Sequence, residues 1–153
     1  MSNARPARMI DVGPKPQTHR VAVASGGVRV SKDLVRLIRA GELEKGDPLE
    51  ISRIAGIAAS KRAADLLPLC HPISITRVEV QARIVGSSRV EFESRIEAHD
   101  RTGVEMEALT AVAAACLCFY DVCKKHDPGM VIDQIRLDEK SGGRSGHFVR
   151  KGE

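Results

Sequence analysis

The fold is decided by residues 103–125, GVEMEALTAVAAACLCFYDVCKK, which predict one long helix. At about 100° per residue, a strip of small or acidic side chains falls within about 40° of one line along this helix. The strip consists of Glu107, Ala111, Ala114, Cys118 and Asp121. The other side carries the residues of a core stripe: Leu109, Val112, Ala113, Cys116, Phe119, Tyr120 and Cys123. We therefore expect two packing partners for this helix, and the partner on the small strip must approach closely.

The two acids of this strip lie too far apart to serve one small reacting centre within one chain. Glu107 and Asp121 are separated by 14 residues (121 − 107), which is ~21 Å along a helix axis. Two such helices, antiparallel about a two-fold axis near Ala114, would bring Glu107 of one chain beside Asp121 of the other. The spacing predicts an oligomer whose active sites are shared between chains.

The segments on either side of the helix alternate in hydrophobicity. Residues 73–85 and 89–99 predict a β-hairpin around the turn Gly86-Ser87-Ser88. Residues 130–137 predict a last strand after the break Asp127-Pro128-Gly129. Upstream, we expect a strand at 48–57 and a short helix at 58–67. The order from residue 48 is then β-α-β-β-α-β, an α+β ferredoxin-like fold with a four-stranded antiparallel sheet and helices on one face.

Outside this unit the predictions are simpler. Residues 31–40 predict a helix with Ser31 as N-cap and Gly41 as its stop, and residues 21–30 are a candidate extra strand. Thr102 and Glu105 match a capping box for the long helix, with a catalytic role for Glu105 as the alternative. We expect a disordered segment at 1–8, a single domain at 9–147 and a tail at 148–153.

Composition limits the function classes. The chain has 153 residues, 42% hydrophobic and 29% charged, with a net charge of +4. Aromatic residues make up 3% with no Trp, which argues against a nucleic-acid platform built on base stacking. No apolar run reaches the ~18 residues that a membrane span needs. The four cysteines include no Cys-x-x-Cys pair, so we expect reduced thiols, no metal site and a cytoplasmic protein.

Three groups of residues could carry chemistry. Leu69-Cys70-His71-Pro72 is a loop in which Pro72 favours an extended His71. Asp121 and Lys124, three apart on the helix, are either an ordinary surface ion pair or, at a buried seam, an acid–base pair. The Gly-rich run 140–147 is either a phosphate-gripping flap or a floppy tail. Several lysines and arginines could meet a triphosphate: Lys45, Lys61, Arg62, Lys124, Lys125 and Lys140.

Several strings are long enough to be specific. They are Met9-Ile10-Asp11-Val12, Ile54-Ala55-Gly56-Ile57, Lys61-Arg62, Leu67-Pro68-Leu69-Cys70-His71-Pro72, Thr102-Gly103-Val104-Glu105-Met106-Glu107-Ala108-Leu109-Thr110-Ala111, Tyr120-Asp121, Cys123-Lys124 and Lys140-Ser141-Gly142-Gly143. In these strings the chain resembles molybdenum cofactor biosynthesis protein C, the cyclic pyranopterin monophosphate synthase family. The resemblance runs from about Met9 to His147. Departures are Ala63 and Arg144, where Thr and Lys are frequent, and a stiffer turn at Asp127-Pro128.

The resemblance implies a cytoplasmic lyase that converts (8S)-3′,8-cyclo-7,8-dihydroguanosine 5′-triphosphate to cyclic pyranopterin monophosphate and releases diphosphate. It implies a homohexamer, a trimer of dimers, with sites at subunit interfaces. Asp121 is expected to be catalytic, with Lys124 as its acid–base partner. Substrate-binding residues are expected to be Leu69, Cys70, His71, Met106, Glu107, Lys45, Lys61, Arg20 and Lys140. No metal or cofactor is expected, with Mg²⁺ accompanying the triphosphate as the open alternative.

Two rival hypotheses remain at this point. A non-catalytic nucleotide- or RNA-binding module would suit the basic surplus and the sheet, but it would want exposed aromatic residues on that sheet, where Phe92 alone offers little. A structural subunit would use the small strip for assembly only.

Overall fold

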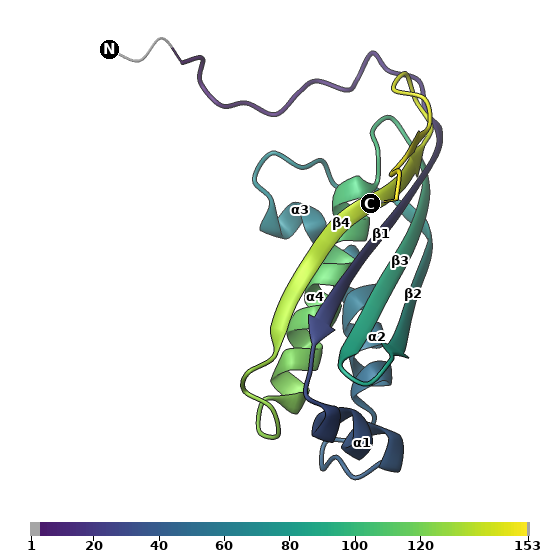
Figure 1. Cartoon of the computed structure of the whole chain (residues 1–153). Coiled ribbons are helices and arrows are strands. Elements are labelled where there is room, and N and C mark those ends of the chain that lie inside the picture. Colours follow the sequence, from purple (N-terminus) through teal and green to yellow (C-terminus); the bar gives the residue numbers. More distant parts are fainter. Residues whose placement is uncertain (1–3, 153) are drawn as a thin grey trace.

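The computed structural model describes residues 4–152 and has an open five-stranded antiparallel sheet with helices packed against it (Figure 1). The strands are β1 (Thr18–Arg29), β2 (Ile75–Val85), β3 (Arg89–Asp100), β4 (Val131–Ser141) and β5 (Phe148–Val149). The helices are α1 (Lys32–Ala40), α2 (Pro48–Ser60), α3 (Ala63–Leu66) and α4 (Glu105–Cys123). The sheet order is β2-β3-β1-β4-β5. Without β5 this is the ferredoxin-like order, so the predicted fold class is confirmed, with one strand more than expected.

The first strand of the fold is not the one that the sequence predicted. The candidate extra strand at 21–30 lies within β1, which pairs with β3 from Thr18–Asp100 to Arg29–Arg89 and with β4 on its other side. Gly26 brings this strand against α4, because a Cβ there would lie only 2.7 Å from Val112 Cγ1. β1 is therefore the central strand on which the long helix packs.

The predicted strand at 48–57 is wrong, because this segment forms α2. Asp47 caps the helix by accepting hydrogen bonds from the backbone N–H groups of Leu49 (2.9 Å) and Glu50 (3.4 Å). Pro48 occupies the first turn, where its missing N–H costs nothing. The short helix predicted at 58–67 shrinks to α3, and its first residues belong to α2.

The other predicted elements are confirmed with small shifts of their ends: α1, the β2–β3 hairpin, α4 and β4. The capping box is wrong. Val104 is the N-cap of α4, no side chain caps it, and the Glu105 carboxylate accepts a hydrogen bond from Lys140 instead. The tail expected at 148–153 begins with β5, which pairs with Glu139 and Lys140 at the edge of β4.

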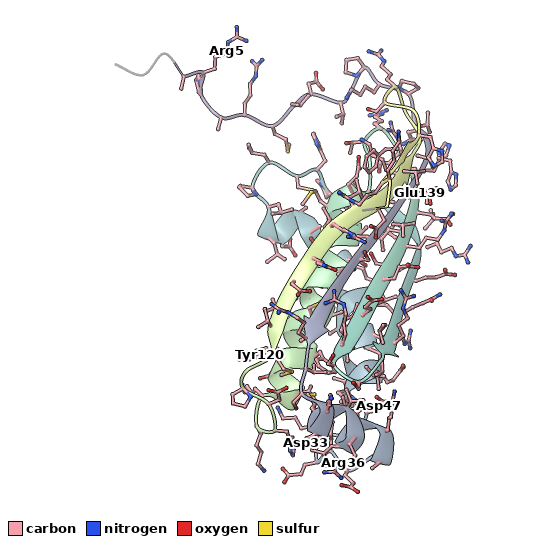
Figure 2. All side chains as sticks on the ribbon, in the orientation of Figure 1. Arg5, Asp33, Arg36, Asp47, Tyr120 and Glu139 are labelled. Atoms are coloured by element: carbon pink, nitrogen blue, oxygen red, sulfur yellow. The ribbon has the colours of Figure 1, made fainter. Side chains whose placement is uncertain are left out.

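The sheet has one covered face and one open face. α4 packs on β1, β3 and β4, and α2 packs on β2. On the open face, charged side chains form cross-strand pairs between β2 and β3, such as Arg83–Glu91 and Arg77–Glu97. Figure 2 shows many of these side chains reaching outward from the β2–β3 side. This division explains the alternating pattern of the hairpin.

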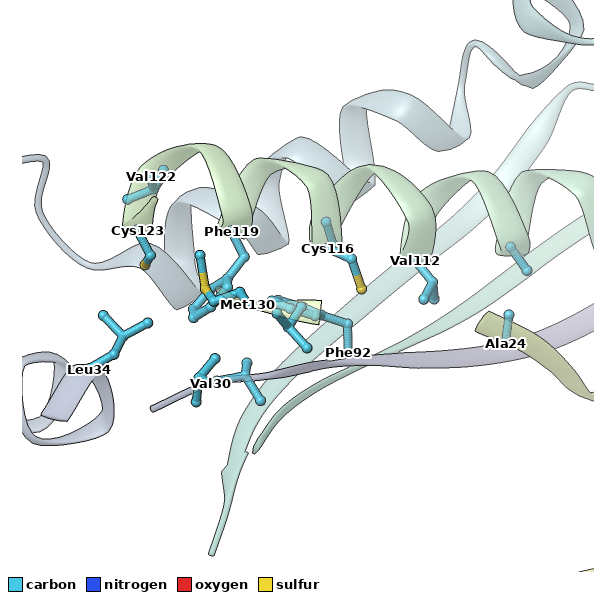
Figure 3. Packing of buried hydrophobic residues seen from close by; sticks show 14 of the residues in the cluster. Ala24, Val30, Leu34, Phe92, Val112, Cys116, Phe119, Val122, Cys123 and Met130 are labelled. Carbon is cyan, nitrogen blue, oxygen red and sulfur yellow. The ribbon is translucent and has the colours of Figure 1, made fainter. Parts of the chain in front are cut away.

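The core lies between α4 and the sheet (Figure 3). Phe92 of β3 and Phe119 of α4 are fully buried and meet edge to face, with ring centroids 6.0 Å apart. Cys116 and Cys123 are buried in the same cluster, which continues toward α1 through Leu34. Among the described residues all four cysteines are free thiols.

Only the second half of the small strip of α4 is accessible to solvent in this chain. Glu107 and Ala111 are buried, Ala114 and Cys118 are half-buried, and Asp121 is exposed. The close neighbour on Ala111 is α2 of the same chain, because a Cβ on Gly56 would lie 2.9 Å from the Ala111 carbonyl oxygen. The expectation that a second chain covers the whole strip is therefore wrong for its first half.

By length and composition alone, α4 is apolar enough to cross a membrane, but core helices of soluble proteins pass the same test. Half of its most apolar stretch is buried inside the structure, against the sheet and α2. Its apolar character is explained by this packing.

Before β1, residues 4–17 form an arm without helix or strand, whose first part extends away from the body (Figure 1) and whose last part, at Lys15 and Pro16, lies against it. A turn interrupts the arm, since Lys15 N–H donates to the Val12 carbonyl at 3.0 Å. The disordered segment predicted at 1–8 lies partly outside the described residues, which begin at residue 4.

Candidate active site

The candidate site residues gather at the two ends of α4. Figure 2 labels Tyr120 near one end and Glu139, on β4, near the other. Two adjoining cavities lie at the Glu139 end, and a small acid–lysine group lies at the Tyr120 end.

The first cavity, called the apolar cavity below, has a volume of about 570 Å³. It is lined by the loop after α3 and the start of α4: Leu67, Pro68, Leu69, Cys70, His71, Ile73, Thr102, Gly103, Glu105 and Met106. Within this loop, Cys70 N–H donates a hydrogen bond to the Leu67 carbonyl at 3.1 Å and so forms a turn. The structure thus brings together four predicted substrate-binding residues, which are Leu69, Cys70, His71 and Met106.

Glu107 is not among the residues that line this cavity and is only 3% exposed, although it directly follows the lining residue Met106 on α4. Its Oε2 has no hydrogen-bond partner among the described residues. Burial raises the pKa of this carboxyl to about 7, with the negative charges of Glu105 and Asp100 adding to the shift and a backbone hydrogen bond opposing it. Burial, with Glu107 nearby, also raises the pKa of the Cys70 thiol. A carboxyl group whose pKa is near 7 is partly protonated at neutral pH, so it can either donate or accept a hydrogen bond.

The second cavity, called the cationic cavity below, has a volume of about 390 Å³ and shares the wall Thr102, Gly103 and Glu105 with the first. Five cationic residues line it: Lys15, Arg20, Arg101, Lys140 and Arg144. Thr18 also lines it, and its buried Oγ1 has no partner among the described residues. A cavity of this charge suits a polyphosphate.

Arg20 is held in the cationic cavity by the backbone. Its Nε donates to the Asp100 carbonyl (3.3 Å) and its Nη2 to the Arg101 carbonyl (3.1 Å). Gly143, with φ of 72°, lies against the guanidinium, where a Cβ would collide with Nη1. The predicted flap is therefore a connection between β4 and β5 that packs on Arg20.

At the other end of α4, Lys124 Nζ donates to Asp121 Oδ1 at 2.6 Å, and Lys45 Nζ lies 3.5 Å from Asp121 Oδ2. All three side chains are more than half exposed. The Lys124 hydrogen bond, its charge and that of Lys45 lower the pKa of Asp121, and Asp121 raises the pKa of Lys124. The buried seam that acid–base work would need is thus absent within one chain.

One predicted residue stays apart. Lys61 is exposed at the C-terminal cap of α2 and lines neither the cavities nor the Asp121 group. Conversely, sequence reasoning missed Lys15, Thr18 and Arg101. Arg101 directly follows β3 and Lys15 precedes β1, so only the pairing of these two strands shows that they meet.

The MoaC family model matches residues 9–143. A protein of Thermomicrobium roseum is 54% identical over 146 residues, covering 95% of this chain and 88% of its own length. One of Heliobacterium modesticaldum is 51% identical over 146 residues, with 95% and 92% covered. One of Roseiflexus sp. is 54% identical over 144 residues, with 94% and 91% covered. All three are named cyclic pyranopterin monophosphate synthase. The chain belongs to the MoaC family.

Proposed function

We propose that this chain acts in molybdenum cofactor biosynthesis and converts (8S)-3′,8-cyclo-7,8-dihydroguanosine 5′-triphosphate to cyclic pyranopterin monophosphate, with release of diphosphate. One observation carries the proposal. In a chain of the MoaC family, whose relatives bear the name of this synthase, an apolar cavity and a cationic cavity share one wall. A substrate with a ring at one end and a triphosphate at the other matches such a pair.

Each cavity binds a different part of the substrate. The guanine-derived ring enters the apolar cavity, where His71 and Glu107 orient it by hydrogen bonds and Leu69, Cys70 and Met106 contact its faces. The triphosphate enters the cationic cavity, where Arg20 and Lys140 meet its oxygens. Closing a phosphate ring on the α-phosphorus expels diphosphate, so fixed cations there stabilise the charge that develops on the leaving oxygens.

The acid–base pair comes from a neighbouring chain. Within one chain, Glu107 and Asp121 are ~21 Å apart along α4, so Asp121 and Lys124 cannot reach a ring held by His71. The outer side of α4 carries exposed apolar residues, with Met106 38% and Leu117 63% exposed. This surface supports a homohexamer, a trimer of dimers, in which a second chain covers it. Burial in the interface would also supply the desolvation that adjusts the pKa values of Asp121 and Lys124 for proton transfer.

The remaining groups have supporting roles. Lys45 holds Asp121 in place and adds a cation at the composite site, and Lys61 reaches it only if the neighbouring chain approaches α2. The described residues contain no group of three or more His, Cys, Asp or Glu side chains that could hold a metal. The proposed reaction calls for no resident cofactor, and Mg²⁺ accompanying the triphosphate stays the open alternative. Free thiols support a reducing compartment, the cytoplasm.

The test is to incubate the purified protein with the cyclised dihydro-GTP and to measure diphosphate and cyclic pyranopterin monophosphate. We expect release by the wild type and loss by Lys124→Ala and by His71→Ala. Lys32→Ala removes another exposed lysine, at the start of α1, and should retain activity. An assembled wild type that releases no diphosphate would refute the proposal. A steep salt dependence of RNA binding in its place would favour the RNA-binding module.

A further inference from the structure

Glu105 occupies the wall between the two cavities. It lines both of them, and it is the one acid among the described residues that line the cationic cavity. A carboxylate weakens the attraction of that cavity for phosphate. A site that only bound a polyanion would bind it more tightly without the Glu105 carboxylate, so we expect Glu105 to have another role.

Its contact indicates that role. Lys140 Nζ donates to Glu105 Oε1 at 2.9 Å, and the two side chains are 30% and 26% exposed. Lys140 lies on β4 and Glu105 on α4, so the pair joins two elements that line the cationic cavity. A lysine side chain is a flexible stem with a mobile charge. Pairing with Glu105 therefore fixes the ammonium group at the junction of the cavities.

Gly103 makes room for this carboxylate. A Cβ on Gly103 would lie 2.8 Å from Glu105 Oε1 and would overlap Oε2. Gly103 is not among the glycines with positive φ, so its backbone does not require glycine. The space does. Helix capping does not explain Glu105 either, because no side chain caps α4.

We infer that Glu105 is a positioning residue, seated by Gly103, which aims Lys140 at the phosphate closest to the ring. This inference rests on the proposed function. With the ring in the apolar cavity and the phosphates in the cationic cavity, the junction faces the α-phosphate, where the phosphate ring closes and the bond to diphosphate breaks. A cation already held there stabilises the departing charge without reorganising during the reaction.

The experiment compares three variants of the full chain, Glu105→Gln, Gly103→Ala and Lys140→Ala, and the double variant Glu105→Gln/Lys140→Ala. Diphosphate release gives kcat and KM, and calorimetry gives the affinity for inorganic diphosphate. Glu105→Gln removes one negative charge, so it should bind inorganic diphosphate at least threefold more tightly while its kcat falls at least tenfold. Gly103→Ala keeps every charge, so its kcat should fall without tighter binding.

The double variant separates positioning from other roles. Once Lys140 is gone, Glu105→Gln should lower kcat by less than twofold further. Glu50→Gln is the matched control, since Glu50 lies in the first turn of α2 and pairs with Arg53; its kcat should stay at the wild-type value. If Glu105→Gln aggregates, Gly103→Ala tests the loss of kcat in its place, and an unchanged kcat would overturn the inference.

The inference is overturned if wild type is active and Glu105→Gln keeps its kcat, or if the loss of kcat is undiminished in the Lys140→Ala background. A wild type that releases no diphosphate would instead remove the proposed function, and this inference with it.

Discussion

Glu107 should make the stability of the protein depend on pH. Its carboxyl has a pKa of about 7 in the folded chain against an ordinary value of 4.5. Because the folded value is raised, the contribution of this group to stability is fully present below pH ~4.5 and is lost as the pH rises through about 7. The change that tests this is Glu107→Gln, which keeps the shape of the side chain and cannot ionise.

The magnitude follows from the two pKa values. At 1.36 kcal/mol per pKa unit, the ionised carboxyl costs about 3 kcal/mol at pH 8 and about 1 kcal/mol at pH 5. Glu107→Gln should therefore raise the free energy of unfolding by about 2 kcal/mol more at pH 8 than at pH 5. A constant penalty from the new amide would shift both values equally and leave this difference unchanged.

The assay is urea unfolding of wild type and variant at pH 5, 6, 7 and 8. All samples have one protein concentration, because the stability of an oligomer would depend on concentration. Glu50→Gln is the control, since Glu50 is exposed and its pKa is lowered by a hydrogen bond from Arg53. It should show no gain at high pH. If Glu107→Gln changes stability by the same amount at pH 5 and pH 8, Glu107 is not a desolvated acid and the reasoning is wrong.

Three further predictions follow from close contacts and burial. Gly56→Ala places a methyl group 2.9 Å from the Ala111 carbonyl oxygen, so it should lower the free energy of unfolding in urea by about 1–3 kcal/mol; unchanged stability would mean that α2 does not press on α4 there. Gly143→Ala should weaken calorimetric binding of inorganic diphosphate by roughly tenfold or more, because it displaces the Arg20 guanidinium and so removes about one charge-assisted contact; wild-type affinity would exclude Arg20 from the anion site. Burial raises the pKa of Cys116 and of Cys123 to about 12, so neither should react with a thiol reagent at pH 8 until urea unfolds the chain, and labelling of either in the native protein would contradict the packing of α4.

The parts of the fold with a strict period could be predicted from the sequence. The β2–β3 hairpin alternates residue by residue, and α4 is too long to be anything but a helix. The segment of α2 predicts a strand because its apolar residues Leu49, Ile51, Ile54 and Ile57 are closely spaced over few residues, and periodicity alone cannot separate helix from strand in so short a segment. The local signal that distinguishes a helix from a strand here is Asp47 as N-cap, followed by Pro48 as the first residue of the helix.

The site was predicted where one motif supplied several residues, as in the loop Leu69-Cys70-His71. It was missed where strand pairing joins distant residues, as with Lys15, Thr18 and Arg101. Glu105 shows the limit most clearly. The spacing from Thr102 to Glu105 fits a capping box. In the structure, however, the Glu105 carboxylate accepts a hydrogen bond from the Lys140 ammonium group, and no side chain caps α4. A partner 35 residues away leaves no trace in the local pattern.

The central claim, that each active site takes His71 from one chain and Asp121 from another, is tested most directly by mixing inactive subunits. Equal amounts of His71→Ala and Asp121→Ala chains are co-expressed with different tags, and oligomers that carry both tags are purified. Random assembly would leave about one site in four with both wild-type residues, so we predict about a quarter of the wild-type rate of diphosphate release. Oligomers shown to contain both chains, but no more active than either variant alone, would contradict the account.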